Sequence, residues 1–117
     1  PRGRLFSYDE KTKELDLLLD NLYFPNGLQL TPDKQAILIN ENSMARILKF
    51  HLKGEKKGKK EVFIDLPGFG DTIRLTDHNT LMAPTVAVRC GKFPSILDMF
   101  GKYPLIRTIF GFVIFSF

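Results

Sequence analysis

The stretches LYFPNGLQL at residues 22–30 and LPGFGDTIRL at residues 66–75 are two versions of one pattern. Matching segments precede them: RLFSY at 4–8 resembles RILKF at 46–50, and ELDLLLD at 14–20 resembles EVFID at 61–65. The copies are offset by 42 residues from Arg4 to Arg46 and by 45 from Leu28 to Ile73. Such a period, with four short strands per unit, is typical of propeller blades, which bury their faces only against their neighbours.

Around these copies, short apolar or alternating runs lie between turn residues, which is the spacing of strands in an all-β fold. The runs are residues 5–8, 14–19, 27–31, 36–39, 46–52 and 61–65. They amount to about two blades, whereas a propeller closes with roughly four to eight. We therefore predict a mainly β chain, with a partial β-propeller of about two blades over residues 1–88.

From residue 89 the repeat is lost, and the apolar spacing becomes helical. Residues 93–100 and 103–110 each place a proline near the first turn of a short helix. We expect residues 89–117 to form a helical insertion followed by a truncated apolar tail. Because the chain opens on Pro1 and runs directly into an apolar stretch, we also expect it to be a piece of a longer protein.

The net charge of +4 comes from one segment, residues 53–60, which holds five lysines and one glutamate. The rest of the chain is balanced. No aromatic residues interleave with these lysines to stack bases, so the pattern favours a solvated, exposed loop and argues against nucleic-acid binding. We expect this loop to lie far from the mouth of the propeller channel.

Few residues carry a recognisable chemical motif. Cys90 is the single cysteine, which excludes an internal disulfide. His51 and His78 have no carboxylate or serine at motif spacing, and we interpret them as strand and loop residues. The longest charge-free apolar run, residues 108–117, is about half of the roughly 20 residues that a spanning helix requires. The catalytic residues stay unknown at this stage.

Asn26 and Asp71 occupy equivalent places in the two copies, each at the start of an inner strand. Inner strands surround the central channel of a propeller, so these side chains are expected to converge at its mouth. Amide and carboxylate oxygens are ligands that calcium selects. Asparagine and aspartate are also ordinary turn residues that bond their own backbone, and the residues alone leave both interpretations open.

The ordered motifs resemble the strictosidine synthase-like branch of six-bladed propellers, which is related to paraoxonases and gluconolactonases. The resemblance runs from about residue 3 to residue 110. It is carried by GRL at 3–5, LYFPNGLQL at 22–30, MARI at 44–47, LKG at 52–54, LPGF at 66–69, Asp71-x-Ile-Arg74, SILD at 95–98 and YPLI at 103–106.

The resemblance implies a calcium-supported hydrolase of the arylesterase or lactonase type, acting on a small ester or lactone. Asn26 and Asp71 fall on the family's metal-facing residues, and Thr72 stands where relatives usually have a second asparagine. It further implies a glycoprotein family whose full-length member is membrane-associated through an anchor outside this chain, on the lumenal or cell-surface side.

Two functions are compatible with these residues. The chain is either part of such an enzyme or part of a non-catalytic, membrane-associated propeller scaffold or binding module. In both cases we expect the isolated chain to be inactive as an esterase and at best marginally folded, because two blades leave sheet faces uncovered.

Overall fold

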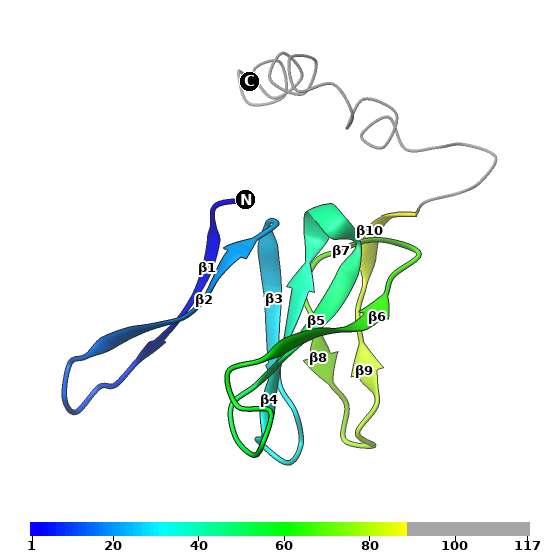
Figure 1. Cartoon of the computed structure of the whole chain (residues 1–117). Helices are drawn as coiled ribbons and strands as arrows, with labels where there is room; N and C mark the ends of the chain where they lie inside the picture. Colours follow the sequence, from blue (N-terminus) through cyan, green and yellow to red (C-terminus); the bar gives the residue numbers. More distant parts are fainter. Residues whose placement is uncertain (89–117) are drawn as a thin grey trace. The chain divides into compact units, whose positions relative to one another are not determined.

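Ten strands and one 3₁₀ turn make up the part of the chain that the structure, a computed structural model, describes: residues 1–88 (Figure 1). The predicted helices at 93–100 and 103–110, and the segment 89–117 that contains them, lie outside the described residues. In chain order the elements are β1 (Gly3–Tyr8), β2 (Leu15–Leu22), β3 (Pro25–Leu30), β4 (Ala36–Glu41), η1 (Asn42–Met44), β5 (Arg46–His51), β6 (Lys60–Asp65), β7 (Gly68–Gly70), β8 (Arg74–Leu75), β9 (Leu81–Met82) and β10 (Thr85–Val88).

The central element is a four-stranded antiparallel sheet in the order β3-β4-β5-β6, coloured from cyan to green in Figure 1. Consecutive strands pair with each other, as in a propeller blade. At one end of the sheet the register aligns Pro25, Glu41, Arg46 and Asp65. At the other end lie the β3–β4 turn and the β5–β6 loop.

Within the described residues, three two-stranded sheets precede or follow this sheet along the chain. β1 pairs with β2 before it, and β7 with β10 and β8 with β9 after it. The β1–β2 hairpin corresponds to β5–β6 in the sequence repeat, so it represents the outer half of a preceding unit. The prediction of a mainly β chain arranged as part of a propeller, about two blades in all, is confirmed by this strand order.

The two middle strands of the sheet, β4 and β5, are covered on both faces, because successive side chains of a strand point to opposite faces. On one face Ile39 and Leu48 pack in a cluster with Leu5 and Leu22 of the β1–β2 hairpin. On the other, Leu38 and Ile47 pack with Ile73, which is fully buried. Burying each such side chain contributes about 1.5 to 3 kcal/mol, so these two clusters hold the neighbouring units together.

Large apolar side chains remain exposed on the outer strands. They include Phe6, Tyr8, Leu15 and Leu17 on the β1–β2 hairpin, and Val62, Phe63 and Ile64 on β6. This agrees with the expectation that about two blades leave sheet faces uncovered. Within residues 1–88, no helix has the length and apolar character needed to cross a membrane.

Candidate functional site

The turn that carries Asn26 is held in an uncommon backbone conformation. Phe24, immediately before β3, has a φ of 52°, which lies in the left-handed region that bulky residues rarely adopt. Two contacts from the end of β4 fix this turn. The Tyr23 N–H donates to Glu41 Oε1 at 2.8 Å, and the Asn42 N–H donates to the Phe24 carbonyl at 3.1 Å. Asn26 is thus placed by a turn that the sheet itself restrains.

Asp71 follows directly after β7, whose three residues are all buried. Its backbone is bonded on both sides: its N–H donates to the Pro84 carbonyl at 3.1 Å, and its carbonyl accepts from Asn40 Nδ2 at 2.7 Å. The preceding carbonyl, that of Gly70, accepts from Asn42 Nδ2 at 2.6 Å. The backbone at Asp71 is therefore anchored to the end of β4.

The structure brings the two predicted site residues into contact. Asn26 Nδ2 donates a hydrogen bond to Asp71 Oδ1, across 45 residues of sequence. Gly27 makes this approach possible, because a Cβ at that position would lie 2.8 Å from the Asp71 carbonyl oxygen and 2.7 Å from the Ile73 nitrogen. Asn26 is exposed and Asp71 is half-buried, so the pair is open to solvent.

The turn before Asn26 is also bonded to an ion pair whose carboxylate is buried. The side chain of Glu41 is 1% exposed, and its Oε2 accepts from Arg46 Nε at 2.7 Å while Oε1 accepts from the Tyr23 backbone. Each carboxylate oxygen therefore has a donor, which is the condition under which a buried charge is tolerated. Glu41 joins the β4–β5 hairpin to the turn that precedes Asn26.

Asn40 is also fully buried, but its side chain is only half-satisfied. Nδ2 donates to the Asp71 carbonyl, whereas Oδ1 has no hydrogen-bond partner among the described residues. Asn40 and Glu41 are adjacent on β4 and point to opposite faces. Glu41 therefore contacts the segment before the sheet, and Asn40 contacts the segment after it.

The chemistry of the Asn26 and Asp71 pair fits a hard cation. In the structure the amide nitrogen of Asn26 faces the Asp71 carboxylate. Rotation of the amide by half a turn would bring Asn26 Oδ1 toward the carboxylate instead. Two oxygens that face each other are favourable only with a cation between them. Calcium takes six to eight oxygen ligands, so this pair would supply part of a site. Within residues 1–88 there is no group of three or more histidine, cysteine, aspartate or glutamate side chains able to hold a metal.

Sequence reasoning missed the three residues that surround the pair: Asn40, Glu41 and Asn42. It ended the strand at Ile39, whereas β4 continues to Glu41. A signal was present, since four consecutive polar residues follow the apolar run AILI without a lysine or glycine among them, unlike the lysine loop at 53–60.

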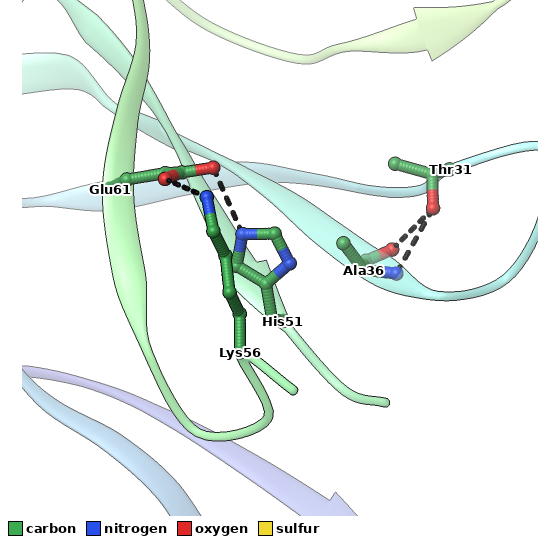
Figure 2. A network of polar contacts seen from close by, with 5 residues as sticks. All are labelled: Thr31, Ala36, His51, Lys56 and Glu61. Atoms are coloured by element: carbon green, nitrogen blue, oxygen red, sulfur yellow. Dashed lines mark hydrogen bonds and ion pairs between the residues drawn. The ribbon is translucent and has the colours of Figure 1, made fainter. Parts of the chain in front are cut away.

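The opposite end of the sheet carries a different polar network (Figure 2). His51 Nε2 lies 2.9 Å from Glu61 Oε1, and Lys56 Nζ lies 3.2 Å from Glu61 Oε2. The hydrogen bond from His51, and then that from Lys56, lower the pKa of the Glu61 carboxyl. His51 is the last residue of β5, in agreement with its interpretation as a strand residue. Its carboxylate partner is ten residues away in the sequence and is brought close by the β5–β6 pairing.

The turn between β3 and β4 lies at this same end. Thr31 Oγ1 accepts from the Ala36 N–H at 3.0 Å (Figure 2). The hydroxyl of Thr31, followed by the Gln35 N–H, lowers the pKa of the Asp33 carboxyl. Residues 53–60 of the lysine loop are all exposed, as predicted, and they join β5 to β6 at the end of the sheet away from Asn26.

The sequence of this chain is similar to those of known proteins. The sequence model of the family described as strictosidine synthase matches residues 1–55. The adipocyte plasma membrane-associated protein of Danio rerio is 40% identical over 115 residues, which cover 97% of this chain and 28% of that protein. That of Bos taurus is likewise 40% identical over 97% of this chain, covering 28% of its own length.

A plant relative shows the same relationship. The strictosidine synthase-like 13 protein of Arabidopsis thaliana is 38% identical over 108 residues, which cover 92% of this chain and 26% of that protein. The resemblance predicted from the ordered motifs is confirmed by these matches. The chain spans little more than a quarter of the length of these relatives.

Proposed function

We propose that this strictosidine synthase-like chain supplies part of a calcium-supported site that hydrolyses small esters or lactones in a longer protein. The observation that carries the proposal is the contact between Asn26 and Asp71, two oxygen-bearing side chains from equivalent positions of consecutive repeat units. A structural turn residue would bond its own backbone. These two side chains instead meet each other across 45 residues of sequence.

In this proposal Asn26 and Asp71 hold the cation through one amide and one carboxylate oxygen, and the remaining ligands come from water or from residues beyond 1–88. When bound, calcium would polarise an ester carbonyl and stabilise the developing negative charge on its oxygen. The role of this chain is to fix two ligands in place before substrate arrives. The group that activates the attacking water is assigned to another part of the protein, because His51 lies at the far end of the sheet.

The names of the animal relatives describe association with the plasma membrane. We extend this to the longer protein that contains the present chain and place its propeller on the lumenal or cell-surface side. Extracellular sites commonly bind calcium with dissociation constants of about 10⁻⁴ to 10⁻³ M, which suits a site with few charged ligands.

The test uses a chimera in which this chain replaces the aligned 115 residues of the Danio rerio protein. Hydrolysis of phenyl acetate and of an aromatic lactone is followed with and without a calcium chelator. We expect calcium-dependent turnover that falls at least about tenfold in Asp71→Ala and in Asn26→Ala. The matched control replaces Lys53, Lys56 and Lys57 with glutamine and should keep full turnover.

Two results would contradict the proposal. Turnover that is unchanged by the chelator and by Asp71→Ala would show that the pair is not part of the site. A folded, calcium-binding chimera without hydrolysis of either substrate would favour the alternative function, a non-catalytic propeller scaffold.

A further inference from the structure

We propose that Asn40 and Asn42 are positioning residues that set the separation of Asn26 and Asp71. The proposal rests on the cation-binding role of that pair given above. Neither asparagine contacts the pair through the oxygens that would face a cation. Both act on the backbone that carries the pair.

The side chains of the two asparagines donate hydrogen bonds to consecutive backbone carbonyls. Asn42 Nδ2 bonds the Gly70 carbonyl at 2.6 Å, and Asn40 Nδ2 bonds the Asp71 carbonyl at 2.7 Å. Two bonds to adjacent peptide units restrain both the position and the rotation of the backbone between them. The Cα of Asp71 lies at that point, so the direction of its carboxylate is restrained as well.

The segment that contains Asn40 and Asn42 also contacts the turn that carries Asn26. The backbone N–H of Asn42 donates to the Phe24 carbonyl, two residues before Asn26. Asn42 therefore touches the Asn26 turn with its main chain and the Asp71 segment with its side chain. Asn42, the first residue of η1 directly after β4, therefore links the two halves of the candidate site.

The side chain of Asn40 packs closely against the backbone at Gly70. A Cβ added at Gly70 would lie 2.6 Å from Asn40 Nδ2 and 3.0 Å from its Oδ1. Both bonds from the asparagines are direct, with no space for an intervening water. A small displacement of the amide would therefore move the segment that carries Asp71.

Asn40 is a costly residue for a purely structural role. Its side chain is fully buried, and Oδ1 has no partner among the described residues. A leucine has similar size, would bury apolar surface on the same face as Leu38 and Ile73, and would remove the unpaired Oδ1. What leucine cannot supply is the N–H that holds the Asp71 carbonyl.

The experiment compares calcium affinity with stability in the chimera with the Danio rerio protein, because the isolated chain is expected to be at best marginally folded. The variants are Asn40→Leu and Asn42→Ala, and the matched control is Gln29→Leu. The control removes another amide contact between sheets, from the Leu75 N–H to Gln29 Oε1 at 3.4 Å, four residues beyond Asp71. Calcium affinity is measured by calorimetry, and thermal unfolding is measured without calcium.

We expect Asn40→Leu and Asn42→Ala to lose about tenfold or more in calcium affinity, and Gln29→Leu to stay within about twofold. The unfolding midpoint of Asn40→Leu without calcium should change little, because removal of the unpaired Oδ1 offsets loss of the bond to the Asp71 carbonyl. A residue with only a structural role would lower the midpoint and leave the affinity of the folded fraction unchanged.

Equal calcium affinity in the two asparagine variants and the unsubstituted chimera would overturn the proposal. So would an equal loss in Gln29→Leu, because the effect would then be general. If Asn40→Leu does not fold, Asn42→Ala decides the question alone, since the Asn42 side chain is only half-buried.

If the unsubstituted chimera binds no calcium, the metal proposal fails and the positioning role is judged by hydrogen–deuterium exchange of residues 68–75. Faster exchange in both asparagine variants than in Gln29→Leu supports positioning. Unchanged exchange overturns it.

Discussion

The two ends of the four-stranded sheet differ in how they use polar residues. At the end that carries Asn26, buried side chains bond the backbone of neighbouring segments: Glu41 to Tyr23, and Asn40 to Asp71. At the end that carries the lysine loop, the polar side chains are more exposed and bond mainly one another or their own turn. The strands separate these ends by roughly 20 Å.

This difference indicates where structure and chemistry are coupled. A buried polar group is costly unless it is paired, so its bonds constrain the segments that they join. Exposed ion pairs contribute little and constrain little. The end with buried contacts is therefore the end where a substitution should alter the candidate site.

The largest effect is expected for Glu41→Ala. The change leaves the Tyr23 N–H without an acceptor and the partly exposed Arg46 without its partner, which should cost about 2 to 4 kcal/mol of unfolding free energy. Urea unfolding followed by circular dichroism measures it, with Glu55→Ala in the exposed lysine loop as the control. Similar midpoints for the two variants would remove the contrast between the ends.

A smaller effect is expected for Gly27→Ala, because a Cβ would meet backbone atoms of residues 71–73 at 2.7 to 2.9 Å. Overpacking of this kind costs about 1 to 3 kcal/mol and should separate Asn26 from Asp71, so calcium affinity should fall as well. Gly54→Ala, in the lysine loop, is the matched variant at the other end of the sheet. Its φ of 78° makes alanine unfavourable by roughly 1 to 2 kcal/mol, but an added Cβ would have no atom from elsewhere in the chain within 4 Å. A loss of calcium affinity in Gly54→Ala would contradict the separation of the two ends.

Glu61→Gln should have a small, pH-dependent effect. The pKa of Glu61 is lowered in the folded chain by His51 and Lys56, so its ionised form stabilises the fold above the ordinary glutamate pKa of 4.5. This contribution is lost as the pH falls through the lowered pKa. The unfolding midpoint of the variant should therefore lie slightly below that of the unsubstituted chain at pH 7, and the two should converge in acid below pH 4.5. A difference that grows on acidification would be incompatible with this sign.

The least effect is expected when Lys53, Lys56 and Lys57 are all replaced by glutamine. These side chains are exposed, so stability should change by no more than about 0.5 kcal/mol per site. Calcium affinity, measured by calorimetry, should stay within about twofold, apart from a weak long-range effect of removing positive charge. A tenfold change would place the loop near the site.

The sequence predicted the fold well because the signals were local and repeated. Alternating apolar residues and turn signals located β1 to β6, and the two copies of the pattern placed Asn26 and Asp71 in equivalent positions. The short strands β7, β9 and β10 were not among the predicted runs. Burial of Asn40 and Glu41 could not be read in this way, since it depends on segments more than 15 residues away that close over each face of β4. The contact between His51 and Glu61 likewise depends on the β5–β6 register.

The central claim is that Asn26 and Asp71 bind one cation, and calcium titration of the chimera with the Danio rerio protein by calorimetry tests it most directly. We predict saturable binding of one calcium ion with a dissociation constant of about 10⁻⁴ to 10⁻³ M. Binding should be lost in Asp71→Ala and retained when Lys53, Lys56 and Lys57 are replaced by glutamine. A folded chimera that gives no binding heat, or gives the same heat with Asp71→Ala, would contradict the claim.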